Sequence, residues 1–324
     1  MAILVFVEST DGTIKKTSLE AISYAKALGE QMGDSEITAL AMGTFDESTL
    51  SGLGKYGATR VLHAADDRLN QPVIQAVASA LYQAVTHTGA KTVVAAKSSL
   101  ADPVAAKVAV KMQAALVSNV TELPDLNDGF KVKRSVYTGK AFAITTVNRE
   151  NKIISIKKNA IELSEQGDDA PVETLDVQLN DSDFDVTLTN TEKAAGGVPL
   201  GEAELIVSGG RGLKGPENWS VIEDLAQALS ATTGCSKPVS DMEWRPHHEH
   251  VGQTGVKVSP QLYVAVGISG AVQHVAGVNS SKYIVVINKD AEAPFFKAAD
   301  YGIVGDAFEV LPKLTKAIKD SANN

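Results

Sequence analysis

The sequence has a single cysteine, Cys235, so the chain contains no second thiol with which to form an intramolecular disulfide. Such cysteine usage is typical of proteins from a reducing compartment. No apolar run reaches the roughly 20 residues needed to cross a bilayer, so we expect no direct insertion into a membrane. The sequence enters an apolar strand at Ile3 without a signal- or transit-peptide pattern. We therefore expect a cytoplasmic protein.

Positive charge and aromatic residues are also scarce. The chain has 30 lysines and arginines against 39 aspartates and glutamates, which gives a formal net charge of -9. We therefore expect no nucleic-acid partner, because binding to DNA or RNA depends on an excess of basic residues. Aromatic residues make up 5% of the chain. The core must then be built from Ala, Val, Ile and Leu, which suit parallel sheets covered by helices.

The length of 324 residues suggests two domains. Strand-length apolar runs, such as 3–7 and 262–266, alternate with segments of helical periodicity in both halves. This alternation predicts an α/β fold in which each domain has a mostly parallel sheet flanked by helices. A glycine-containing linker at 193–199 separates the two patterns. We place an N-terminal α/β domain at 1–195 and a second domain at 196–324.

The alternation of strands and helices is interrupted near residue 130. Residues 131–148 and 152–158 have no helical period and are predicted to form exposed strands of an antiparallel ribbon. The lysines in these segments, together with Arg134, could indicate a nucleic-acid surface. Because the whole chain is acidic, we favour the solvated face of a ribbon.

A glycine-rich turn, Ser208-Gly209-Gly210-Arg211-Gly212-Leu213, follows the strand predicted at 203–207. Glycines let backbone N–H groups approach a phosphate closely, and Arg211 adds a forked cation suited to a pyrophosphate. The alternative is a tight strand-to-helix turn with a surface arginine. We favour phosphate binding, although the turn has neither a Walker loop nor the G-x-G-x-x-G pattern.

A second polar turn occupies residues 267–274, after the strand predicted at 262–266. Ser269 is expected to cap a helix that begins there, and the free N–H groups of a first helical turn form an anion site. His274 lies on or just after that turn, so we expect it to face the same ligand. A purely structural role for His274 is the alternative.

Other polar residues of the second domain give weaker signals. The glycine loop 251–255, Asn288 and Asp306 follow or connect strands, and Asn288 could either recognise a ribose or base edge or cap a loop. The run His247-His248-Glu249-His250 resembles a metal cluster, but consecutive residues cannot easily converge on one ion. We therefore expect no metal. No nucleophile–base spacing or carboxylate pair stands out, so we assign no catalytic residue.

These C-terminal segments together resemble the α-subunit of electron-transfer flavoproteins, in the family's order over about residues 203–312. The N-terminal domain is similar in layout, with a weaker sequence signal. The resemblance implies a Rossmann-like C-terminal domain that holds FAD. It rests on Ser208 to Lys214, Val251 to Gly255, Leu262 to His274, Ile287 to Asp290 and Ala299 to Asp306.

The resemblance also implies roles for individual residues. Arg211 would contact the cofactor phosphates, and His274 would lie at the flavin's pyrimidine edge, where a hydrogen-bond donor stabilises negative charge on the reduced ring. Lys237 is a departure, because the family usually has an arginine there, stacked on the flavin, and this leaves the flavin potential open. The implied cofactor-binding residues are Arg211, Ser236, Lys237, Val251, Gly252, Gln253, Thr254, Ser269, Gly270, Ala271, Val272, Gln273 and His274, with Asn288, Asp306 and Ala307 toward the adenosine half.

The function implied by the resemblance is that of an electron carrier without a substrate of its own. The family passes electrons from acyl-CoA and other dehydrogenases, as in fatty-acid β-oxidation, to a membrane-bound quinone oxidoreductase. It works as a heterodimer with a β-subunit that binds AMP, or a second FAD in bifurcating members. Two alternatives remain open. One is an NAD(H)-dependent oxidoreductase, and the other is an adenine-nucleotide-binding regulatory module.

Overall fold

The chain forms two compact units, Met1–Thr191 and Glu192–Asn324. The boundary predicted near residue 195, like most of the predicted linker, lies within 190–197, outside the described residues. The structure, a computed structural model, describes residues 2–10, 12–33, 36–139, 141–189, 198–201 and 203–322.

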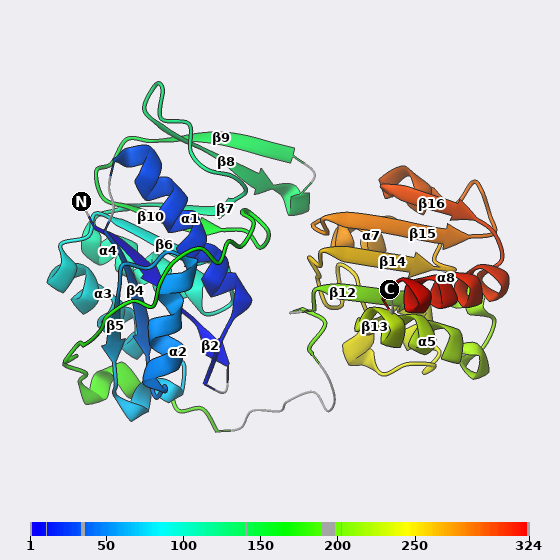
Figure 1. Ribbon diagram of the computed structural model, residues 1–324, viewed down its shortest axis with the longest axis horizontal. Coiled ribbons are helices and arrows are strands. Elements are labelled where there is room, and N and C mark those ends of the chain that lie inside the picture. The colour runs from blue at the N-terminus through cyan, green and yellow to red at the C-terminus, as the bar shows by residue number, and fades with distance from the viewer. Residues whose placement is uncertain are drawn as a thin grey trace. The chain divides into compact units, whose positions relative to one another are not determined.

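The N-terminal unit is built on a nine-stranded sheet and a two-stranded hairpin. The strands are β1 Ile3–Phe6, β2 Ser9–Thr10, β3 Thr13–Ile14, β4 Ile37–Met42, β5 Arg60–Ala64, β6 Thr92–Ala96, β7 Ala115–Val120, β8 Phe130–Val136, β9 Ala141–Val147, β10 Lys152–Ile156 and β11 Val172–Thr174. Their order in the large sheet is β11-β5-β4-β1-β6-β10-β7-β8-β9 (Figure 1). The sheet is parallel from β11 to β7, and β8 and β9 add an antiparallel edge.

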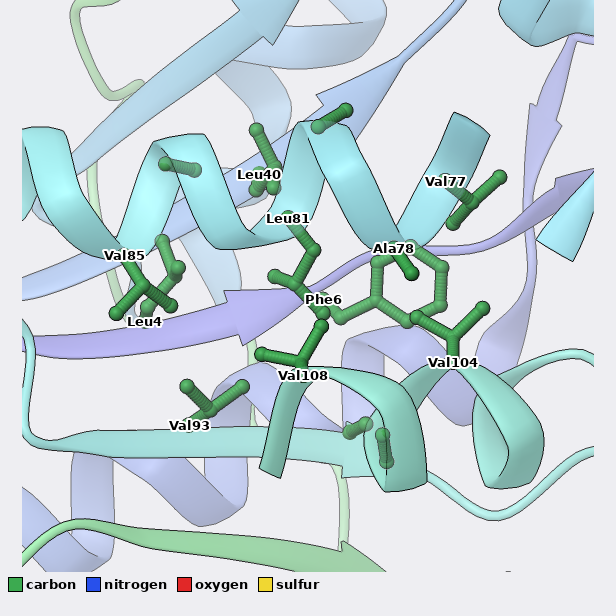
Figure 2. Close-up of a cluster of buried hydrophobic side chains, with 14 of the residues drawn as sticks. Leu4, Phe6, Leu40, Val77, Ala78, Leu81, Val85, Val93, Val104 and Val108 are labelled. Atoms are coloured by element: carbon green, nitrogen blue, oxygen red, sulfur yellow. The ribbon is translucent and has the colours of Figure 1, made fainter. Parts of the chain in front are cut away.

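Helices cover both faces of the central strands. The helices are α1 Lys16–Met32, α2 Glu47–Ser51, α3 Ile74–Thr88 and α4 Ala101–Met112, and the short 3-10 helices are η1 Gly52–Tyr56, η2 Asp67–Asn70, η3 Tyr137–Gly139 and η4 Asp181–Phe184. Because side chains alternate along a strand, Leu4 and Phe6 of β1 pack against α3 and α4, whereas Ile3 and Val5 share a core with α1. Figure 2 shows Leu4 and Phe6 among the side chains of α3 and α4.

The prediction of an exposed antiparallel ribbon is half right. Strands β8 and β9 form the antiparallel hairpin expected for 131–148, although Lys140 at its turn lies outside the described residues. The prediction for 152–158 is wrong, because β10 lies between β6 and β7, parallel to both, with Ile153, Ile154 and Ile156 buried. A strand covered on both faces has no polar alternation, and its short apolar run does not distinguish a central strand from an edge.

The C-terminal unit is a five-stranded parallel sheet. The strands are β12 Leu205–Gly209, β13 Thr232–Cys235, β14 Leu262–Val266, β15 Tyr283–Asn288 and β16 Tyr301–Val304. The helices are α5 Ser220–Leu229, α6 Lys237–Asp241, α7 Val272–Val278 and α8 Ala307–Ala322, with η5 Arg211–Leu213, η6 Pro216–Asn218, η7 His247–Glu249 and η8 Pro294–Ala298. The strands lie in the order β13-β12-β14-β15-β16 (Figure 1). From β12 the chain first adds β13 on one side and then continues with β14 on the other, so the strand order reverses between β12 and β14. In open parallel sheets, ligands bind beyond the carboxyl ends of the strands at such a reversal.

Each face of this second sheet has its own core. Val207 and Val264 pack with α5 and α8, whereas Ile206 and Tyr263 pack with α7 and η8. The predicted fold class, two α/β units with mostly parallel sheets flanked by helices, is therefore confirmed. Within the described part of the chain, no helix has both the length and the apolar character needed to cross a membrane.

Candidate functional site

The turns that follow β12 and β14 contact each other through glycines. The N–H of Gly210 donates to the carbonyl of Val266 at 2.8 Å, and the N–H of Gly212 donates to the carbonyl of Gly267 at 3.0 Å. A Cβ on Gly210 would lie 2.2 Å from the carbonyl oxygen of Gly267, so no larger residue fits there. We call Gly210, Gly212 and Gly267 the glycine seam. Its glycines serve close contact between two turns, and the N–H groups of Gly210 and Gly212 are not free for a phosphate as the sequence had suggested.

A pocket of about 660 Å³ opens at these carboxyl ends. Its volume lies within the roughly 300–1,000 Å³ typical of cofactor and small-molecule sites. It brings together most of the predicted cofactor-binding residues: Arg211, Ser236, Lys237, Val251, Gly252, Gln253, Thr254, Ser269, Ala271, Gln273, His274 and Asn288. The pocket is also lined by residues outside the predicted set of cofactor-binding residues: Gly212, Pro238, Asp241, His250, Gly267, Ile268 and Asp290.

Gly270, Val272, Asp306 and Ala307, which were also predicted to bind the cofactor, do not line the pocket. Asp306 immediately precedes α8, and its Oδ1 accepts the N–H of Phe308 at 2.9 Å. Ala307 is buried in the core, and Val272 is exposed. Gly270 has a φ of +84°, a conformation that favours glycine. The contact of these four residues with a cofactor stays a prediction.

The loop after β14 differs from its predicted form. Helix α7 begins only at Val272, and the exposed Ser269 does not cap it. Asn288 donates from Nδ2 to the carbonyl of Ile268 at 3.1 Å and accepts the N–H of Asp290 at 3.1 Å. Of the two roles left open for Asn288, loop capping is therefore seen in the structure.

Two cations line the pocket, and they differ in their partners. Nζ of Lys237 lies 2.9 Å from Oδ1 of Asp241, one turn later on α6. Arg211 is exposed at the start of η5, and within the described residues its side chain forms no hydrogen bond or ion pair. Of these two cations, Arg211 is therefore the one whose charge no carboxylate of the described residues offsets.

Two buried histidines also line the pocket, with His274 6% and His250 2% exposed. Nε2 of His274 lies 2.8 Å from the hydroxyl oxygen of Tyr263. Burial lowers the pKa of His274 to about 4, and the nearby His250 acts in the same direction. Burial also lowers the pKa of His250. Both rings are therefore mainly neutral at pH 7, and Nδ1 of each has no hydrogen-bond partner within the described residues.

His250 comes from the run 247–250 that resembled a metal cluster. The members of this run diverge in the structure. Glu249 pairs with Arg245 at 2.6 Å, whereas His250 lies beside Cys235 in an isolated parallel bridge. No group of three or more His, Cys, Asp or Glu side chains among the described residues could hold a metal ion. No sequence signal separated His250 from its neighbours, because its place depends on the strand pairing.

The N-terminal unit has a smaller pocket, of about 380 Å³, beyond the ends of β1 and β4. Its buried carboxylate, Glu8, is already paired, since Nζ of Lys15 lies 3.3 Å from Oε2 and the hydroxyl of Ser98 donates to Oε1. The described residues that line this pocket include no cation. The pocket of the C-terminal unit is therefore the better candidate for a phosphate-bearing ligand.

Comparison with known proteins gives matches along almost the whole chain. A family model described as "Electron transfer flavoprotein domain" matches residues 3–180, and one described as "Electron transfer flavoprotein FAD-binding domain" matches residues 199–279. The electron transfer flavoprotein subunit alpha of Bacillus subtilis is 35% identical over 319 residues, covering 98% of this chain and 97% of the relative. The subunit alpha of Paracoccus denitrificans is 36% identical over 321 residues, covering 97% and 99%. That of Syntrophomonas wolfei is 35% identical over 317 residues, covering 97% and 98%. The chain therefore belongs to the electron transfer flavoprotein family, among its alpha subunits.

Proposed function

We propose that the chain binds FAD in the pocket of its C-terminal unit and acts as the flavin-carrying subunit of a heterodimeric electron carrier. One observation carries this proposal. At the reversal of strand order, a single pocket combines the cation Arg211 with two buried neutral histidines, and among the described residues neither the Arg211 side chain nor either Nδ1 atom has a partner. A buried polar atom without a partner is costly unless a ligand supplies one. Such a pocket suits a ligand with both a phosphate and a polar aromatic ring.

The residues present fit FAD in kind. Arg211 would hold a phosphate through its planar, forked guanidinium. His250 and His274 would meet polar atoms of the ring, and the exposed Gln253 and Thr254 offer further hydrogen-bonding groups at the pocket wall. When bound, FAD supplies electron transfer in steps of one or two electrons. The chain itself would bind the cofactor, orient it and limit its contact with water.

We further propose that the chain works with a β-subunit that holds AMP or a second FAD. The family assignment supports a two-subunit protein. So does the edge strand β9, on which Phe142 and Ile144 are 59% and 65% exposed. Exposed apolar residues on a sheet edge are typical of a surface that another protein covers. In this proposal the complex is cytoplasmic and takes electrons from acyl-CoA and other dehydrogenases. It delivers them to a membrane-bound quinone oxidoreductase.

The test is co-expression of the chain with its β-subunit, followed by absorbance spectroscopy of the purified complex. We expect a yellow protein, with about one flavin released per chain on denaturation beyond any held by the β-subunit. A colourless complex that takes up no added FAD would overturn the proposal. If that complex bound NADH with nucleotide-dependent dehydrogenase activity, the NAD(H)-dependent enzyme would be favoured. Adenine-nucleotide binding without redox activity would favour the regulatory module.

A further inference from the structure

A tyrosine that does not line the pocket forms a hydrogen bond with one of the pocket's histidines. Tyr263, on β14, is fully buried, and its hydroxyl oxygen lies 2.8 Å from Nε2 of His274. Phe295 packs edge-on against the same imidazole, with ring centroids 5.6 Å apart. The orientation of the His274 ring is therefore set by neighbours in the core. One ring nitrogen meets Tyr263, and the other has no hydrogen-bond partner within the described residues.

Two arrangements of the protons are compatible with this contact. A neutral imidazole has one N–H, and a phenol can either donate or accept. If Tyr263 donates to Nε2, the imidazole proton lies on Nδ1. If Nε2 donates to Tyr263, the phenol proton must find another acceptor and Nδ1 becomes a buried lone pair. Proton positions follow from the hydrogen-bonding groups around the pair, so the neighbours decide between the two arrangements.

The neighbours favour donation by Tyr263. Burial raises the pKa of Tyr263, so the phenol keeps its proton, and a buried phenol proton needs an acceptor. Within the described residues, Nε2 of His274 is the one hydrogen-bond partner of that hydroxyl, and the hydroxyl of Ser208 forms no hydrogen bond. The hydroxyl of Tyr263 therefore donates its proton to the hydrogen bond with Nε2 of His274.

We propose that Tyr263 is a positioning residue whose hydroxyl donates to Nε2 of His274 and thereby fixes the tautomer that carries its proton on Nδ1. His274 then presents a donor, rather than a lone pair, on the side away from Tyr263. The consequence for electron transfer rests on the proposed function, because an N–H stabilises negative charge on a reduced flavin ring whereas a lone pair repels it.

The tautomer can be measured directly by NMR. The full chain, labelled with ¹⁵N-histidine and purified with its β-subunit, would be recorded after removal of flavin, and His274→Gln would identify the signals of His274. We expect a pyrrole-type Nδ1 and a pyridine-type Nε2. Tyr263→Phe should shift the ratio of the two tautomers toward Nε2–H by roughly tenfold, the factor that one hydrogen bond supplies. Tyr283→Phe, an exposed position on β15, is the matched control and should leave the ratio unchanged.

Wild-type protein with the proton on Nε2 would overturn the proposal, as would a Tyr263→Phe variant with an unaltered tautomer. If that variant does not fold, wild-type chain labelled with 3-fluorotyrosine replaces it. The more acidic phenol should then move the Nε2 signal toward the pyrrole type. A shift in the opposite direction, or none, would contradict donation by Tyr263. Because these spectra need no flavin, their outcome is independent of FAD binding, which absorbance measures separately.

Discussion

Lys237 and Asp241 form an ion pair at the pocket wall, with Nζ 2.9 Å from Oδ1 one helical turn away. Their side chains are 58% and 54% exposed. An exposed pair of this kind contributes about 0–1 kcal/mol, so it does not lock Lys237 in place. The neighbouring carboxylate does offset the lysine's positive charge. This pair stands where the family resemblance leads one to expect an arginine stacked on the flavin.

Replacement of Lys237 tests the electrostatics of this wall. Arginine is planar and weakly hydrated, so Lys237→Arg should place more positive charge against the ring. The one-electron potential of the flavin should rise by roughly 20–80 mV, while Lys237→Gln should lower it. Asp241→Asn is the matched variant and should also raise the potential, because it removes the competing carboxylate. Spectroelectrochemical titration of the complex measures all three. Unchanged potentials throughout would mean that the pair points away from the flavin.

Arg211 is predicted to dominate cofactor affinity. Arg211→Ala removes a charge-assisted contact to phosphate worth about 2–4 kcal/mol, which weakens FAD binding by roughly 30- to 700-fold. The variant should fold but lose much of its flavin on dialysis. Lys214→Ala is the control, because Lys214 does not line the pocket and lies over the ring of Phe308, 5.2 Å from its centroid. Full flavin occupancy in Arg211→Ala would contradict the assignment.

The burial of His274 predicts a pH dependence of stability. Its pKa falls from 6.5 to about 4 on folding, so protonation favours the unfolded chain. The stabilisation is present above pH 6.5 and is lost as the pH falls from 6.5 toward 4, by about 3 kcal/mol in all. Urea unfolding at several pH values can follow this through tryptophan fluorescence, because Trp219 and Trp244 both lie in the C-terminal unit.

His274→Gln is the comparison for that experiment. It lacks the titrating ring, so its stability should change less than that of the wild type between pH 7 and pH 4.5. Parallel curves for the two proteins would show that His274 is accessible to protons in the folded state.

The exposed apolar edge of β9 is predicted to matter for assembly. Without the β-subunit, the chain should be poorly soluble or low in flavin, because Phe142 and Ile144 remain uncovered. Phe142→Ser should reduce co-purification of the β-subunit. Val110→Ser, which changes a residue that is 79% exposed on α4, should not. Size-exclusion chromatography of the lone chain provides the check. A stable, fully flavin-loaded monomer would count against a required partner.

Local patterns predicted much of the fold and of the candidate site. The strand at 262–266 is found at β14 with the same bounds, because its apolar run between Pro260 and Gly267 is a local signal. Arg211 and His274 were predicted to line the site because each lies in a glycine-containing turn that follows a predicted strand. Contacts between distant segments were beyond the sequence: the approach of Gly210 to Gly267, the pairing of His250 beside Cys235, and the insertion of β10 between β6 and β7. Each depends on which strands are neighbours, and one-dimensional periodicity does not encode that choice.

The glycine seam has a consequence for how this chain can vary. Backbone hydrogen bonds join the two turns, and the carbonyl of Gly267 and the side chain of Ile268 lie directly against Gly210. Repacking of the apolar layers around α5 or α8 therefore need not alter the separation of those turns. One added methyl group at Gly210 would wedge them apart. Substitutions in the apolar core can therefore leave the dimensions of the ligand site unchanged. Substitutions at Gly210, Gly212 or Gly267 would alter them, although these glycines have no side chain that could contact a ligand.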